Sequence, residues 1–299
     1  MLSGARNLKE KRRLKIGWHD TSLTGALKAL VVVCIFAGVG VGILFLDAHI
    51  KKTTSVRKAI AVDLIGVPVW VSDQLREKVH AAIRADGDEL RLDENTAVLV
   101  QRNISERVAW LAEVRVQTTY EGLRIQGRWR KPLALVKSAL RKIYIDAEQV
   151  VLDFVPMPNL PIVELKGLLP MTKSPQPGEV WQREDLAAAV AILARLDRMD
   201  ELTTPDKPLL SEIDGIDVSN FKGRKNKTLP HIVLYTKDGT EIIWGAELGT
   251  WGQHLEATDE EKLARLYGYY KESGTLLGGA KYINLRDPQD RVPLPIDKY

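Results

Sequence analysis

The sequence predicts an α+β protein behind a single N-terminal transmembrane helix. Three observations lead to this fold class: one long apolar run, a stretch in which the hydrophobic period changes from helical to alternating, and a later stretch of alternating strands with flanking helices. The predicted parts are a cytoplasmic basic tail at 1–28, a transmembrane helix at 29–46, a polar stem at 47–58, a small domain at 59–130, a larger mixed β domain at 131–287 and a proline-rich tail at 288–299.

The transmembrane helix is the first predicted element. The run from Ala29 to Leu46 has no charge and no proline, and at 1.5 Å per residue it spans roughly 27 Å, close to the thickness of a bilayer core. Residues 1–28 carry seven basic and two acidic residues, so the positive-inside rule keeps the N-terminus cytoplasmic. A cleaved signal peptide is the alternative, but the charged region is long and no convincing small-x-small cleavage site follows Leu46.

Composition narrows the class of protein. The 299 residues are 45% hydrophobic, which is typical of a globular chain. Beyond the basic tail, 36 basic residues stand against 37 acidic ones, so no overall charge favours nucleic acid. The single cysteine, Cys34, excludes an internal disulfide and a cysteine-based zinc cluster. Because the five histidines are scattered, we expect no metal site, and no motif predicts a cofactor or a small-molecule substrate.

The small domain is predicted to contain a strand, two helices and two further strands. Alternating apolar residues from Val62 to Val67 predict the first strand, and Ser72 is placed to cap a helix. A second helix begins near Asn95. Its apolar stripe consists of Ala97, Val100, Ile104, Val108 and Leu111. Alternation on both sides of a turn at Tyr120–Gly122 then predicts a hairpin. Helices on one face of a small sheet make a compact module.

The β domain opens with predicted strands at Arg141–Asp146 and Val150–Phe154. Proline-rich connections follow, and apolar residues at helical spacing then predict a helix from Glu184 to Met199. The domain therefore mixes strands with helices.

Its C-terminal half carries the clearest local signals. The stretch His231–Gly245 reads as a hairpin, because Asp238-Gly239 between alternating apolar strands favours a type I′ turn. Thr258 and Glu261 form a capping box for a last helix, which we expect to end at Gly274.

Seven short motifs along the chain carry a family resemblance. They are WLAEVRV at 110–116, RKPLA at 130–134, YIDAEQVV at 144–151, LPI at 160–162 with Gly167, KDG at 237–239, KLxxL at 262–266 and YINLR at 282–286. In this order they cover nearly the whole chain and resemble the bacterial cell division family FtsQ, also called DivIB. Two positions depart from that family's pattern: Asn284 stands where an aspartate is usual, and 147–149 lacks a glycine often seen in that turn.

The resemblance implies a fold and a function. The small domain would be a POTRA domain and the larger one an FtsQ-type β domain. The protein would be a single-pass type II protein of the bacterial inner (cytoplasmic) membrane, with its domains outside the cytoplasm at the division septum. Its partners would be FtsB/FtsL-like coiled-coil membrane proteins and other divisome components. The expected function is a non-catalytic scaffold that links and regulates these partners, which control septal peptidoglycan synthesis.

No residue pattern predicts catalysis. His231 opens a predicted strand and His254 lies in a loop, positions typical of structural or surface histidines. A membrane-anchored cell-wall enzyme or sensor is the alternative function, and it would need a concave pocket with converging polar groups. A POTRA-bearing transport chaperone is a third reading, although such proteins usually carry several POTRA units or a barrel.

The last strand predicts where a partner binds. An edge strand offers unpaired backbone donors and acceptors to an incoming strand. The candidate contact consists of Lys281, Tyr282, Ile283, Asn284, Leu285 and Arg286, where the resemblance places the FtsB-like partner. Tyr282 and Leu285 would anchor the partner from opposite faces of the strand. The alternative is that Ile283 and Leu285 only pack in the domain core.

A basic stretch at the domain junction is a second candidate contact. Between Arg124 and Lys142 there are seven basic residues and no acidic one. The contact would consist of Arg128, Trp129, Arg130 and Lys131. Such a stretch fits an acidic partner, anionic lipid or a cell-wall polymer; the alternative is a solvated strand edge and helix face.

Overall fold

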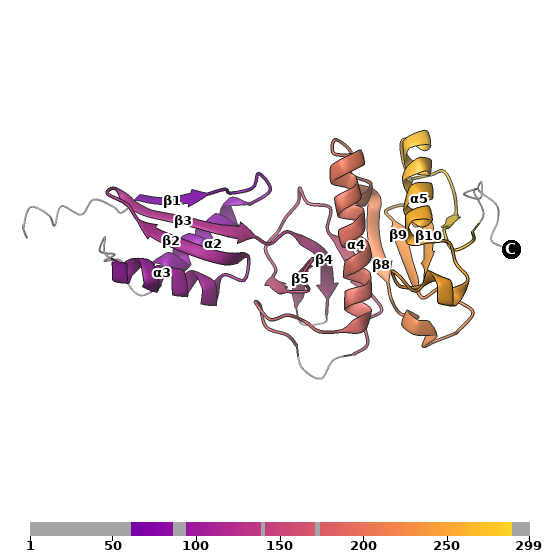
Figure 1. The fold of residues 1–299 in the computed structure, drawn as a ribbon, viewed down its shortest axis with the longest axis horizontal. Helices are drawn as coiled ribbons and strands as arrows, with labels where there is room; N and C mark the ends of the chain where they lie inside the picture. Colours follow the sequence, from indigo (N-terminus) through magenta and orange to yellow (C-terminus); the bar gives the residue numbers. More distant parts are fainter. Residues whose placement is uncertain (1–60, 86–93, 139–140, 171–173, 289–299) are drawn as a thin grey trace, which may run out of the picture. The chain divides into compact units, whose positions relative to one another are not determined.

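The structure, a computed structural model, describes residues 61–85, 94–138, 141–170 and 174–288 (Figure 1). These residues lie in one compact unit. None of their helices combines the length and the hydropathy that a membrane crossing requires. The predicted basic tail, transmembrane helix and stem, and the C-terminal tail beyond Pro288, lie outside the described residues.

The described residues form a mixed α+β fold with two sheets, as the sequence predicts. The first sheet has the order β1-β3-β2, with β1 parallel and β2 antiparallel to the central β3. This part of the chain comprises β1 (Ala61–Ile65), α2 (Asp73–Ile83), α3 (Glu94–Arg107), β2 (Leu111–Thr118) and β3 (Gly122–Trp129). The order of strand, helix, helix, strand and strand is the one expected for 59–130.

Local sequence signals correctly predict where α2 begins but not where α3 ends. Ser72 caps α2 as predicted, because its hydroxyl accepts a hydrogen bond from the N–H of Leu75 at 3.4 Å. Helix α3 ends at Arg107, although the predicted apolar stripe continued to Leu111. Leu111 instead begins β2, where it is also buried. An apolar residue is buried both at the end of a helix and at the start of the next strand. The predicted apolar stripe therefore extended past the end of α3 to Leu111.

The second sheet has eight strands in the order β11-β10-β9-β8-β7-β4-β5-β6. They are β4 (Pro132–Lys137), β5 (Lys142–Asp146), β6 (Val151–Asp153), β7 (Val163–Lys166), β8 (Ile213–Asp217), β9 (Ile232–Thr236), β10 (Glu241–Gly245) and β11 (Tyr282–Asn284). Helices α4 (Glu184–Thr203) and α5 (Asp259–Ser273) pack side by side on one face (Figure 1). The short helices are η1 (Leu209–Glu212), η2 (Phe221–Gly223) and η3 (Trp251–His254).

Three strands of this sheet, β4, β7 and β8, are missing from the sequence prediction. β4 starts at Pro132, inside a stretch that reads as a junction, but proline is tolerated as the first residue of a strand. β8 has the sequence IDGID, whose aspartates and glycine read as a turn. It forms a strand because Ile213 and Ile216 are buried in the core, and because β7 and β9 pair with it on both sides.

The β9–β10 hairpin is confirmed, but its turn is not type I′. A type I′ turn needs positive φ at both central residues, whereas Gly239 has φ 88° and Asp238 does not have positive φ. The carboxylate of Asp238 instead accepts hydrogen bonds from the hydroxyl of Thr236 and the N–H of Thr240. Side-chain hydrogen bonds therefore hold this turn.

Both long helices follow their sequence signals. The capping box of α5 is present, since Thr258 accepts from the N–H of Glu261 at 3.2 Å and the Glu261 carboxylate accepts from the N–H of Thr258 at 2.8 Å. Gly274, with φ 69°, ends α5 as expected. Helix α4 runs past the predicted end at Met199 to Thr203.

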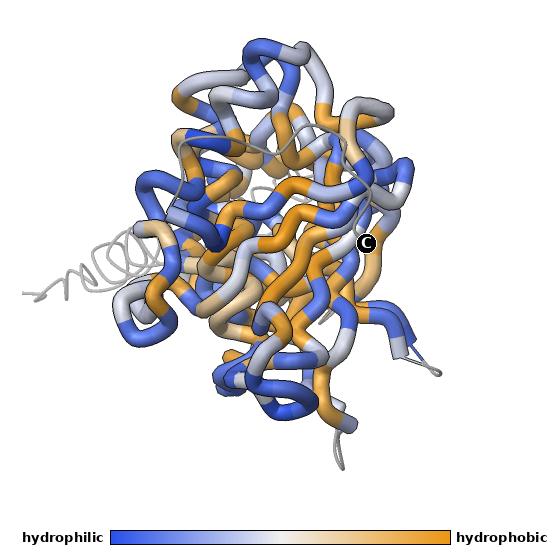
Figure 2. The backbone as a smooth tube through the Cα atoms, turned by 90° about the vertical axis from the view of Figure 1, so that its right-hand side faces the viewer, coloured by the Kyte–Doolittle hydropathy of each residue, from blue (hydrophilic) through white to orange (hydrophobic). Residues whose placement is uncertain are grey.

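Two hydrophobic cores meet at β5 and β6. Ile143 and Ile145 of β5 lie in the core that α4 and α5 cover, while Tyr144 lies in the core of the first sheet. The same division separates Val151 from Leu152 on β6. Successive residues of a strand point to opposite faces, so this end of the second sheet is buried on both faces. In Figure 2 hydrophobic colouring follows the inner strands, and hydrophilic segments form outer loops.

Candidate functional site

β11 lies at one end of the eight-stranded sheet, and among the described residues no further strand pairs with it. It runs parallel to β10, and the N–H of Leu285 donates to the carbonyl of Ile243 at 3.0 Å. Backbone groups of successive residues alternate between the two sides of a strand. The N–H and C=O groups of Tyr282 and Asn284 therefore point away from β10. We name this outer side of β11 the candidate edge.

The side chains of the last strand divide by face. Ile283 and Leu285 are 0% exposed and belong to the core, whereas Tyr282 and Asn284 are half-buried and Lys281 is exposed. The sequence left open whether Leu285 anchors a partner or packs the core. The structure places Leu285 in the core, so the side chain that a partner can reach is that of Tyr282 and not that of Leu285.

A buried carboxylate fixes the C-terminal end of this strand. Glu256 accepts hydrogen bonds from Nε of Arg286 at 2.9 Å, from Nζ of Lys262 at 2.7 Å and from the N–H of Ala246 at 2.9 Å. Burial by itself raises the pKa of the Glu256 carboxyl, but these hydrogen bonds outweigh it and lower that pKa. Arg286 is thus bound to the domain interior, and the candidate edge is held in place.

The arginines of the second candidate contact are paired with carboxylates. Arg130, whose side chain is 15% exposed, lies 2.6 Å from Asp146 and 2.6 Å from Glu148. Arg128 lies 2.7 Å from the same Glu148. The hydrogen bonds from Arg128 and then Arg130 lower the pKa of the Glu148 carboxyl.

The other two residues of that contact are also used within the fold. Nζ of Lys131 lies 2.7 Å from Asp197 on α4, and Trp129 is 9% exposed. Burial raises the pKa of the Asp197 carboxyl even though Lys131 donates to it. The four residues line a hollow whose walls carry these ion pairs. The ion pairs of Arg128, Arg130 and Lys131 join β3 and the β3–β4 connection to the end of β5 and to α4, which leaves little unpaired positive charge for an acidic partner.

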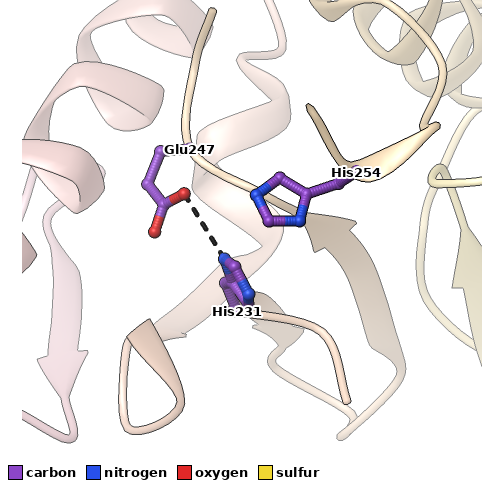
Figure 3. A group of neighbouring side chains, drawn as sticks. All are labelled: His231, Glu247 and His254. Atoms are coloured by element: carbon purple, nitrogen blue, oxygen red, sulfur yellow. Dashed lines mark hydrogen bonds and ion pairs between the residues drawn. The ribbon is translucent and has the colours of Figure 1, made fainter. Parts of the chain in front are cut away.

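A third group of side chains comes together only in the fold (Figure 3). His231 precedes β9, Glu247 follows β10 and His254 ends η3. Nδ1 of His231 lies 3.3 Å from Oε2 of Glu247, and the two imidazole rings meet edge to face with centroids 4.7 Å apart. The sequence offered no signal for this group, because the spacing of the three residues matches no metal-binding motif. We name it the His–Glu–His cluster.

The comparisons with known proteins identify no family for this chain. No protein-family model matches the chain, and no curated protein sequence matches it. The case for a function therefore rests on the motifs of the sequence and on the geometry of the candidate edge.

Proposed function

We propose that the chain is a non-catalytic membrane scaffold of the bacterial divisome, of the FtsQ/DivIB type. In this proposal 59–130 is a POTRA domain, 131–287 is the β domain, and 29–46 anchors both to the cytoplasmic membrane at the septum. The scaffold links and regulates FtsB/FtsL-like coiled-coil partners that control septal peptidoglycan synthesis. The order of the seven motifs supports this, as does the order of elements around the first sheet.

The observation that carries the proposal is the candidate edge. The outward backbone groups of Tyr282 and Asn284 can pair with an extended segment of a partner, which would add a strand to the sheet. Main-chain hydrogen bonds supply affinity in this mode, and side chains supply specificity. The half-buried ring of Tyr282 is placed to supply such a contact. The buried anchors Ile283 and Leu285 keep the strand in register without the partner.

A crosslinking experiment tests the proposal in membranes. A photoreactive residue replaces Tyr282 in the full-length chain, and in a matched chain it replaces Tyr120, a fully exposed tyrosine at the β2–β3 turn. We expect the probe at Tyr282 to capture a small single-span coiled-coil protein, identified by mass spectrometry, and the probe at Tyr120 to capture much less of it. Capture of nothing at Tyr282 by a folded chain contradicts the proposed edge and favours a membrane-anchored enzyme or sensor.

A pair of substitutions separates backbone pairing from side-chain contact. Tyr282→Pro removes an outward N–H at the first residue of β11, where proline leaves the bonds to β10 intact. Tyr282→Ala removes the ring but keeps the N–H. If the partner adds a strand, Tyr282→Pro lowers the amount of partner that co-purifies with the full-length chain from membranes by at least about tenfold, and more than Tyr282→Ala does. Equal effects would mean that only the ring is recognised.

A further inference from the structure

The His–Glu–His cluster brings together three groups that bind metal ions. One potential ligand atom from each of His231, Glu247 and His254 lies within 4.8 Å of the other two. Figure 3 shows one ring nitrogen of His254 turned towards the space between the other two side chains. His231 is 8% exposed, Glu247 is half-buried and His254 is exposed. The cluster therefore has a fixed inner part and one side open to solvent.

The distances are close to those of a tetrahedral site. Zinc bonds of roughly 2.0–2.2 Å to nitrogen and oxygen place neighbouring ligands about 3.4 Å apart in a tetrahedron. Nδ1 of His231 and Oε2 of Glu247 already lie 3.3 Å apart. The remaining separations of up to 4.8 Å involve His254, whose exposed side chain can rotate inward. The inner pair thus has the spacing of two ligands, and the third needs only a small movement.

The protein also orients the carboxylate ligand through a hydrogen bond from the backbone of Lys222. The Lys222 bond goes to Oε1 at 3.2 Å, while Oε2 faces Nδ1 of His231 at 3.3 Å and accepts from the hydroxyl of Thr250 at 3.4 Å. An outer hydrogen bond of this kind orients a metal-binding carboxylate.

We infer that His231, Glu247 and His254 form a binding site for a divalent transition-metal ion of the zinc type. Two imidazoles and one carboxylate are ligands that zinc accepts, and they leave a fourth position for water or another ligand. Imidazole nitrogen favours zinc, copper, iron and nickel, whereas magnesium prefers oxygen. The bound ion links the segment before β9, the loop after β10 and η3.

A hydrogen-bonded pair without metal is the competing explanation. His231 and Glu247 already form a hydrogen bond with each other, so their proximity alone does not require an ion. His254 distinguishes the two explanations, because its side chain is exposed and takes part in no ion pair among the described residues. A metal site needs His254, whereas a simple pair does not.

The test uses the full-length chain in detergent micelles, first treated with a chelator and then titrated with zinc chloride. Bound zinc is counted by elemental analysis, and thermal unfolding is followed in parallel. We expect one saturable equivalent that raises Tm by a few degrees, because a ligand that binds only the folded state stabilises it. Magnesium chloride should leave Tm unchanged.

Three variants test whether the bound zinc ion occupies the His–Glu–His cluster. His254→Ala and Glu247→Gln each remove one ligand and should weaken zinc binding by at least about tenfold. The matched control is His80→Ala, which removes a histidine from the last turn of α2. Any background binding at His19 or His49 is the same in all variants. Zinc binding that is absent, or that falls no more in His254→Ala than in His80→Ala, overturns the inference.

Discussion

The two outer edges of the eight-stranded sheet differ in whether another segment of the described chain covers them. At one end β6 is covered, since the N–H of Val151 donates to the carbonyl of Glu179 at 2.9 Å and its own carbonyl accepts from Gly178 at 2.8 Å. At the other end β11 has its inner face buried, and no strand of the described chain lies beyond it. Open edges invite strand pairing. The described residues therefore cover one edge of the sheet and leave the other without a strand partner, and it is this second edge to which the proposed function assigns a partner.

The largest expected effect concerns the inner face of β11. Leu285→Ala leaves a cavity in the core and should lower the free energy of unfolding by about 2–5 kcal/mol. Tyr282→Ala, on the half-buried side, should cost less than about 1.5 kcal/mol. Urea unfolding of the full-length chain, followed by circular dichroism, measures both. Equal losses would mean that the strand has no distinct inner and outer face.

At the β6 end, a buried ion pair should matter more than its exposed neighbour. Asp146→Asn places an amide N–H₂ or a neutral oxygen against Arg130, which is mostly buried, and should cost about 2–4 kcal/mol. Glu148→Gln is the matched change in the same cluster. Because the Glu148 side chain is 50% exposed, solvent screens its pairs and the expected cost is below about 1 kcal/mol. A reversed order in denaturant unfolding would contradict this view of the junction.

The β5–β6 turn offers a smaller, stabilising change. Gln149 has φ 62°, in the left-handed region that disfavours side chains. Gln149→Gly should therefore raise the free energy of unfolding by about 0.5–1 kcal/mol. The control Ala147→Gly, at a position without positive φ, should lower it by a similar amount. A lower melting temperature for Gln149→Gly would show that its side chain contributes more than its backbone strain costs.

The smallest expected effect is a pH dependence near β11. The hydrogen bond from the Thr236 hydroxyl, with a second from the N–H of Gly278, lowers the pKa of Asp238 to about 2, from an ordinary value of 3.8. A carboxyl whose pKa falls on folding stabilises the fold above its unfolded pKa, and this stabilisation is lost as pH falls through the folded pKa. The stability difference between wild type and Asp238→Asn should thus shrink between pH about 4 and 2. A difference that stays constant over this range would argue against a charged Asp238 in the turn.

The parts of the fold that could be predicted depend on short-range interactions. Ser72 caps α2 with the next turn of the same helix, and Thr258 and Glu261 do the same for α5. Such contacts reach only three residues along the chain, so the sequence shows them directly. Strands β4, β7 and β8 were not predicted. The aspartates and glycine of β8 favour a turn, and each of the three strands pairs with a neighbouring strand on both sides, which the sequence does not show.

The candidate sites follow the same division. The position of the last strand could be predicted, but not which of its side chains face the core. The His–Glu–His cluster could not be predicted at all, since three separate segments bring its ligands together. The basic stretch at 128–131 looked unpaired because its carboxylate partners lie on other elements, such as Asp197 on α4.

The sequence by itself determined the hydrophobic patterning, the helix caps and the hairpin, because these follow from residues close together along the chain. The tertiary structure decided which carboxylates are buried and what they bind. Asp200, one residue beyond the predicted helix end at Met199, is 3% exposed and accepts from the N–H groups of Leu209 and Leu210 and from the hydroxyl of Tyr267. Burial of a charge is compensated only by partners brought from distant segments, and their approach depends on the packing of the whole domain.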